Sequence, residues 1–228
     1  MPSLAVILPA AGRSTRFGTD KLRALLRGSP VIVHTVLAFT QHPQVTQVII
    51  AQGVEGPFAR KADGSFEPVH TKVRVVAGGA SRAQSVWNAL KLVPAEVEWV
   101  AIHDAARPLV SMDLIDRLFA TAIERNTAVA PAMPVSLTIK QATGPLPAVV
   151  EKTVPRQQLW AMQTPQIIQR AALLRAFENC PIPLDEVTDD VQLIELAGGE
   201  VVLVDGDERN LKITTAIDLK IAEMWIGA

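Results

Sequence analysis

The loop after the first apolar run has the composition of a phosphate-binding loop. Residues 8–21 read LPAAGRSTRFGTDK, and five residues separate Gly12 from Gly18, whereas a P-loop has four between its glycines. The dinucleotide fingerprint fails too, because its second glycine is missing. Small residues still let backbone amides approach a ligand, and Arg16 and Lys21 add two cations. This combination suits a triphosphate; the alternative is an ordinary strand-to-helix turn with two solvated basic side chains.

Two later segments also place polar residues directly after an apolar run. In VAIHDAARP the run ends at His103, Asp104 and Arg107, at the expected carboxyl edge of a parallel sheet, where α/β proteins usually bind ligands. Asp104 could bind Mg²⁺ or a ribose hydroxyl, or cap a helix; His103 is better explained as a packed, hydrogen-bonded imidazole. Residues 78–86, GGASRAQSV, open a helix after another apolar run, a placement suited to contacting a base and ribose.

Composition excludes several classes of protein. The 228 residues are 49% apolar, enough for a real core. A net charge of -1 and a pI near 6.4 argue against a nucleic-acid binder, and few aromatic residues are available for stacking on bases. No apolar stretch reaches the roughly 18 residues of a membrane helix and no signal peptide is recognisable, so we expect a cytoplasmic protein without a membrane partner. The lone Cys180 is expected to be a passive thiol.

The elements that must position these residues follow an α/β pattern. Apolar runs of strand length alternate with helix-like segments, and they cover residues 4–8, 45–51, 73–77, 99–102, 128–132 and 201–204. Nearly continuous hydrophobic strands indicate helices on both faces of the sheet. The sequence therefore predicts a doubly wound, mostly parallel sheet.

Helix starts support this pattern. Ser29 is a candidate N-cap followed by Pro30 at the first helical position, and Ser111 precedes an apolar pattern that ends at Asn126. Thr215 and Asp218 have the spacing of a capping box.

Two segments interrupt the alternation. Residues 53–71 are rich in Gly, Pro and charged residues, typical of a surface excursion. Residues 136–155 carry the strand-like runs LTIK and AVVEKTV around QATGPLP, which predicts a projecting β-hairpin arm. Because an isolated two-stranded ribbon is marginal in water, the arm needs a partner, and we expect a second copy of the chain.

Six motifs occur in order: PAAGRSTR, GGASRAQSV, HDAARP, TVPRQQLWAMQTPQ, TDD and NLKITT. Together they resemble the 2-C-methyl-D-erythritol 4-phosphate cytidylyltransferase family over about residues 4–219. The resemblance implies a single nucleotidyltransferase domain, residues 1–228, with a Rossmann-like nucleotidyltransferase fold. It also implies transfer of CMP from CTP to 2-C-methyl-D-erythritol 4-phosphate, in the non-mevalonate isoprenoid pathway, with release of pyrophosphate.

The resemblance also assigns roles residue by residue. The implied catalytic residues are Arg16, Lys21, Arg156 and Lys212. The implied CTP contacts are Pro9, Ala10, Ala11, Gly12, Gly79, Ala80, Arg82, Ser85 and Asp104. The implied substrate contacts are Asp104, Ala105, Arg107, Thr138, Arg156, Thr164, Thr188 and Lys212. The implied cofactor is Mg²⁺ or Mn²⁺, held mainly by the CTP phosphates with Asp104 as a candidate ligand, and the implied assembly is a homodimer whose arm brings Thr138 and Arg156 to the neighbouring subunit's site.

One motif departs from the family pattern. The family has Pro-Lys-Gln at its lysine, whereas this chain has Asp20-Lys21-Leu22, so Arg23 is an alternative cation. Other readings are a cytidylyltransferase for another polyol phosphate, such as ribitol 5-phosphate, or a non-catalytic nucleotide sensor. Cations on both sides of the reacting phosphorus argue against the sensor, because a pure binder does not need them.

Overall fold

The predicted apolar runs form one mixed sheet. The computed structural model describes residues 2–12, 17–18, 20–53, 56–58 and 70–226. The strands of the sheet are β1 (Leu4–Ala10), β4 (Val45–Gln52), β5 (Val73–Ala77), β6 (Trp99–Ile102), β7 (Ala128–Pro134), β10 (Trp160–Met162), β11 (Gln166–Gln169) and β12 (Val201–Asp205). Their order is β10-β7-β11-β6-β1-β4-β5, with β12 paired to β7.

Most neighbouring strands run parallel, as predicted. β1 pairs in parallel with β4 and β6, β4 with β5, and β12 with β7. β10 and β11 run antiparallel to the strands that they contact, and neither of them was predicted. β11 lies between β6 and β7, so the chain enters the middle of the sheet late in the sequence.

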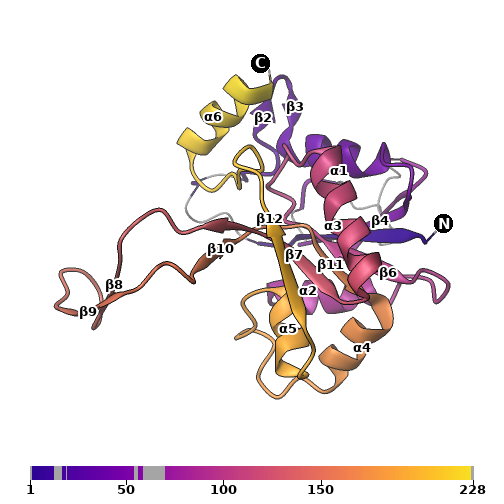
Figure 1. Ribbon diagram of the computed structural model, residues 1–228. Helices are drawn as coiled ribbons and strands as arrows, with labels where there is room; N and C mark the ends of the chain where they lie inside the picture. Colours follow the sequence, from indigo (N-terminus) through magenta and orange to yellow (C-terminus); the bar gives the residue numbers. More distant parts are fainter. Residues whose placement is uncertain (1, 13–16, 19, 54–55, 59–69, 227–228) are drawn as a thin grey trace.

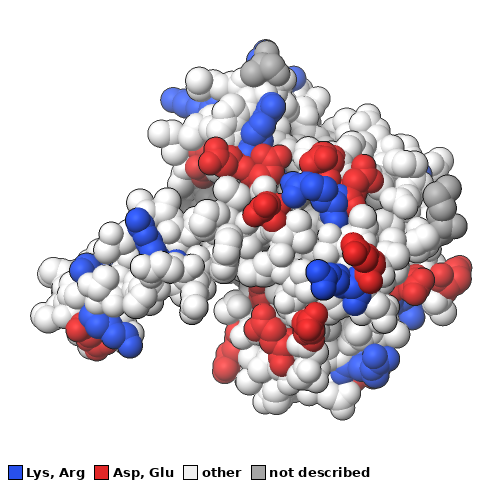
Figure 2. Space-filling view, in the orientation of Figure 1, with Lys and Arg blue, Asp and Glu red and all other residues white. Residues whose placement is uncertain are grey.

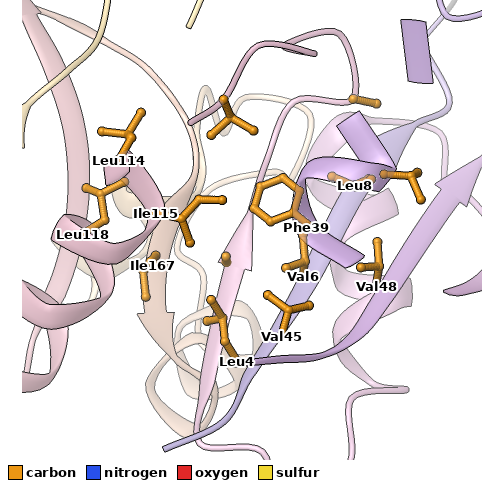
Figure 3. Packing of buried hydrophobic residues seen from close by; sticks show 14 of the residues in the cluster. Leu4, Val6, Leu8, Phe39, Val45, Val48, Leu114, Ile115, Leu118 and Ile167 are labelled. Atoms are coloured by element: carbon orange, nitrogen blue, oxygen red, sulfur yellow. The ribbon is translucent and has the colours of Figure 1, made fainter. Parts of the chain in front are cut away.

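Helices cover both faces of the sheet (Figure 1). One face carries α1 (Val31–Thr40) and α3 (Met112–Arg125); the other carries α2 (Arg82–Leu90), α4 (Arg170–Glu178) and α5 (Asp190–Leu196). Side chains of β1 alternate between the two layers: Val6 packs with Phe39 beneath α1, as Figure 3 shows, while Ile7 faces the α2 layer. The predicted doubly wound α/β class is therefore confirmed.

Two of the three predicted helix starts are confirmed. Ser111 Oγ accepts a hydrogen bond from Leu114 N (3.2 Å), and the helix ends at a left-handed Asn126. At the start of α6 (Ala216–Ile226), Asp218 in the first turn accepts through Oδ2 a hydrogen bond from the backbone N of Thr215 (2.7 Å), as in a capping box. Unlike in a full capping box, the Thr215 hydroxyl also donates to this carboxylate (3.0 Å).

The predicted cap at Ser29 is wrong. The cap position of α1 is Pro30, which has no side-chain cap hydrogen bond. Ser29–Pro30 instead form strand β3, which pairs with β2 (Leu25–Leu26). The two residues between these strands, Arg27 and Gly28, have φ values of 50° and 82°, which suit a tight two-residue hairpin. The hairpin therefore takes Ser29 into a strand ladder.

The predicted β-hairpin projects from the body of the molecule (Figure 1). Its strands β8 (Ile139–Ala142) and β9 (Val150–Val154) pair only with each other within the described residues. Its apolar side chains are open to solvent: Leu146 is 90% exposed and Val149 78%. In Figure 2 much of the arm is white, with a few charged side chains. Such a ribbon needs a partner to be stable.

The predicted excursion at residues 53–71 lies mostly outside the described residues. Where it begins, the Gln52 side chain holds Phe58, donating to its carbonyl O (2.7 Å) and accepting from its N (3.0 Å). Among the described helices, none has both the length and the apolar character needed to cross a membrane.

Gly78 marks a close approach between loops and supplies a test of the packing. A Cβ there would lie 2.7 Å from Ala11 Cβ and 3.2 Å from Gln52 O, so something must shift. We expect Gly78→Ala to lower the free energy of unfolding by about 1–3 kcal/mol, the usual cost of overpacking, in a urea titration.

Gly12→Ala is the matched control. Its Cβ would meet no described atom within 4 Å, so its free energy of unfolding should stay within about 0.5 kcal/mol of the parent. Equal stability of both variants would contradict this account of the Gly78 packing.

Candidate functional site

A pocket of about 300 Å³ opens at the carboxyl ends of β1 and β6. These strands are neighbours, and the chain leaves β1 toward β4 and β5 before crossing back to β6. The strand order therefore reverses at this point, which is where open α/β sheets bind ligands. The pocket is lined by Pro9, Ala10, Ala11, Gly12, Lys21, Leu22, Gly79, Ala80, Ser81, Arg82, Ser85, Asp104, Ala105, Ala106, Lys212 and Thr214.

Asp104 lies at the centre of a cluster of cations. Its Oδ2 is 2.9 Å from Lys212 Nζ and 3.2 Å from Arg107 Nε, and its Oδ1 is 3.6 Å from Arg82 Nε. The residue is only 9% exposed. Burial alone would raise the pKa of this carboxyl, but the charges of Lys212, Arg82 and Arg107 outweigh burial and hold the pKa well below its ordinary value. Asp104 is therefore a permanent anion.

A hydrogen-bonded chain fixes the backbone of Asp104. Its N donates to Thr164 Oγ1 (3.0 Å), which lies 3.1 Å from His103 Nδ1. His103 Nε2 is 3.0 Å from the carbonyl O of Arg107, so Nε2 carries the proton and the Thr164 hydroxyl donates to Nδ1. Burial is the main cause that lowers the pKa of His103 to about 4. The predicted packed, hydrogen-bonded imidazole is confirmed.

The structure places Lys21, rather than Arg23, at the pocket. Lys21 lines the cavity, and its Nζ donates to the carbonyl O of Ile213 (3.1 Å). Arg23 lies outside the lining: its side chain is 56% exposed, it pairs with Asp20 (3.3 Å) and it donates to Gly56 O (2.6 Å). The altered Asp20-Lys21-Leu22 context thus still presents a lysine.

The loop before α2 forms another wall of the pocket. Ser81 caps the helix by accepting from Gln84 N (3.1 Å). Ser85 Oγ accepts from Gly79 N (3.0 Å) and donates to Ser81 O (2.9 Å). The Ser85 hydroxyl thus shapes the loop, while Gly79 and Ala80 present backbone to the cavity.

The remaining predicted residues lie in three places. Arg107 and Thr164 are buried behind Asp104 and support it, outside the pocket lining. Thr138 and Arg156 lie at the base of the arm, where the Arg156 guanidinium donates to Ser136 O. Thr188 is exposed and bonds to Gln192 Oε1 (3.1 Å). Arg16 lies outside the described residues.

Sequence reasoning missed four residues of the lining: Leu22, Ser81, Ala106 and Thr214. Each lies within two residues of a predicted site residue in the sequence, so proximity to the motifs could have found them. It also missed Asp190, whose Oδ2 lies 2.7 Å from Arg82 Nη2; the TDD motif was its only signal.

The described residues do not form a protein cage for a metal ion. They contain no group of three or more His, Cys, Asp and Glu side chains that could hold one. Asp104 is the one carboxylate among the described residues of the lining, and three cations already engage it. A divalent ion at this pocket would therefore depend on oxygens that a ligand supplies.

Comparisons with known proteins point to one family. The family model described as IspD, 2-C-methyl-D-erythritol 4-phosphate cytidylyltransferase, matches residues 4–228. The enzyme of that name from Solibacter usitatus is 38% identical over 98% of this chain and 95% of its own length. The one from Symbiobacterium thermophilum is 42% identical over 98% of this chain and 92% of its own.

A solved structure supports the same assignment. The crystal structure of Francisella tularensis 2-C-methyl-D-erythritol 4-phosphate cytidylyltransferase superposes with a TM-score of 0.83 at 31% identity, covering 97% of this chain and 99% of the other. From the match over nearly its whole length, the chain belongs to the 2-C-methyl-D-erythritol 4-phosphate cytidylyltransferase family.

Proposed function

We propose that this chain transfers the cytidylyl group of CTP to 2-C-methyl-D-erythritol 4-phosphate in the non-mevalonate isoprenoid pathway. The products are pyrophosphate and 4-diphosphocytidyl-2-C-methyl-D-erythritol. The observation that carries the proposal is the pocket at the carboxyl ends of β1 and β6, which both Lys21 and Lys212 line beside the ion-paired Asp104. Membership of the family supplies the identity of the two substrates.

The reaction needs cations more than it needs a base. A phosphate oxygen of the polyol attacks the α-phosphorus of CTP, and the bond from that phosphorus to the β-phosphate oxygen breaks, so pyrophosphate leaves with the electron pair. A phosphate monoester has a second pKa near 6 and is largely a dianion at neutral pH. The neutral, buried His103 agrees with this, since it cannot reach a substrate.

Different residues of the pocket would contact the nucleotide and neutralise the phosphates. The backbone of Ala11, Gly12, Gly79 and Ala80 would contact the nucleotide, since small residues allow close approach. Lys21 would neutralise charge on the phosphates during displacement.

Lys212 would hold the sugar phosphate. Its Nζ lies 2.9 Å from a carboxylate oxygen of Asp104, so it is positioned before a substrate arrives. Arg16, outside the described residues, and Arg156, at the base of the arm, would supply further cations to the phosphates.

A divalent ion fits this site as a companion of CTP. With Asp104 engaged by three cations, Mg²⁺ would be held mainly by triphosphate oxygens and only secondarily by the protein. Bound there, it would neutralise the negative charge of the phosphates.

The first functional test separates Lys21 from Arg23. Lys21→Ala should lower kcat about 10²- to 10³-fold, the usual loss for one electrostatic donor at a reacting centre, in a pyrophosphate-release assay with CTP and 2-C-methyl-D-erythritol 4-phosphate. Arg23→Ala should keep kcat within a few-fold of the parent, because Arg23 is outside the lining.

The opposite ranking would assign the catalytic cation to Arg23. Ribitol 5-phosphate in the same assay decides between polyol substrates: turnover with it at equal or higher kcat/KM would overturn the substrate assignment.

Metal dependence is tested by chelation. Activity should vanish with excess EDTA and return on addition of Mg²⁺ or Mn²⁺, because the triphosphate otherwise brings uncompensated charge to the pocket. Full turnover in the chelator would refute the metal requirement.

The arm is tested by mixing subunits. We propose that the chain is a homodimer in which Arg156 of one copy completes the site of the other, since the arm exposes Leu146 and Val149 and lies apart from its own pocket. Lys21→Ala and Arg156→Ala should each be nearly inactive alone. An equal mixture should recover about one quarter of parental activity, because half the dimers are mixed and each has one intact site.

Proof of subunit exchange, for example by differently tagged copies, is the control. No recovery despite exchange would place Lys21 and Arg156 of the same chain in one site and remove the cross-subunit arm.

A further inference from the structure

A buried carboxylate outside the pocket holds one of its cations. Asp190 is the first residue of α5 and is 1% exposed. Its Oδ2 accepts from Arg82 Nη2 at 2.7 Å, across 108 residues of sequence. Its Oδ1 has no hydrogen-bond partner in the described part of the chain. This carboxylate is therefore committed to Arg82.

Burying this pair is costly, so its retention calls for a reason. Burial is the main cause that raises the pKa of Asp190, although the charge of Arg82 opposes the shift. Buried ion pairs are often no more stabilising than well-packed apolar side chains of similar volume. Arg82 is also the first residue of α2, where the helix dipole disfavours a cation. Stability alone is therefore a weak explanation for this pair.

The position of Asp190 is fixed by the sheet. Gln166 on β11 accepts through Oε1 from the backbone N of Asp190 (2.9 Å) and of Val191 (3.0 Å). Its Nε2 donates to Asp189 Oδ2 (2.8 Å), while Asp189 Oδ1 caps α5 at Gln192 N (3.1 Å). Gln166 pairs with Ile102 at the end of β6, two residues before Asp104. The same strand pairing therefore fixes the position of Asp190 relative to Asp104.

The two carboxylates orient the Arg82 guanidinium. Nη2 is bound to Asp190 and Nε faces Asp104 at 3.6 Å. Within the described residues, Nη1 makes no hydrogen bond to protein, and the side chain, 29% exposed, lines the pocket. The remaining N–H donors are thus available to an anionic ligand in the cavity.

We infer that Asp190 is a positioning residue of the nucleotide site, which acts through Arg82 and never touches the ligand. It keeps the guanidinium on the Oδ1 side of Asp104, leaving the Asp104 Oδ2 atom to Lys212 and Arg107. Without the charge of Asp190, Arg82 would shift toward Asp104 Oδ2 and compete with Lys212. The inference rests on the proposed function, because it takes the ligand to be CTP.

The test measures CTP affinity apart from turnover. Calorimetric titration of the enzyme with Mg²⁺ and CTP should give a dissociation constant about 10- to 100-fold weaker for Asp190→Asn than for the parent, the range of one charged hydrogen bond. Glu195→Gln is the matched control: it removes an exposed carboxylate from the same helix and should leave the affinity for CTP within twofold of the parent.

A double-mutant cycle separates positioning from structure. If Asp190 acts through Arg82, Asp190→Asn should weaken CTP binding no further in an Arg82→Gln background. The double variant leaves neither charge buried without its partner, so it keeps the test available if Asp190→Asn alone does not fold. Additive losses in the cycle, or an Asp190→Asn affinity within twofold of the parent, would overturn the inference. Failure of the parent to bind CTP would instead contradict the proposed function.

Discussion

The buried carboxylate of Asp104 is the constraint on which the rest of the site depends. Lys212, Arg107 and Arg82 each have a nitrogen within 3.6 Å of its oxygens. Without its negative charge, these three neighbouring cations would repel one another. Removing one member of a buried ion pair typically costs about 3–5 kcal/mol, because the partner is left uncompensated. Asp104 therefore fixes the positions of the cations around this pocket.

The fold delivers these cations from segments far apart in the chain. Asp104 follows β6, while Lys212 belongs to the loop between β12 and α6. Two hydrogen bonds hold that loop in place: Ile213 N donates to Ala106 O (2.8 Å), and the Arg107 side chain donates through Nη1 to Asn210 O (2.7 Å). Ile213 also accepts from Lys21. One stretch of irregular backbone thus connects the first loop of the chain to its last, and the reversal of strand order beside β1 leaves room for it.

The α/β body and the projecting arm are stabilised in different ways. The body buries apolar side chains on both faces of the sheet, whereas the arm buries few and leaves Leu146 and Val149 in solvent. A two-stranded ribbon of this kind gains its stability from what it packs against. The assembly that we propose would therefore complete the arm and the site in one event, because the same segment carries Thr138 and Arg156.

The sequence by itself determined the α/β class and the predicted strands of the sheet, and its resemblance to a known family supplied most of the pocket lining. Continuous apolar runs, and small or charged residues directly after them, are local patterns that need no partner to be recognised. Only the tertiary structure decided how the remaining pieces meet. β11 enters the sheet between strands formed earlier, and Ser29 joins a hairpin instead of capping a helix. Arg107 and Thr164 lie behind Asp104, and Asp190 reaches Arg82. Each of these depends on a contact between residues distant in sequence, and side-chain direction across such distances is set by packing and buried charge, not by local propensity.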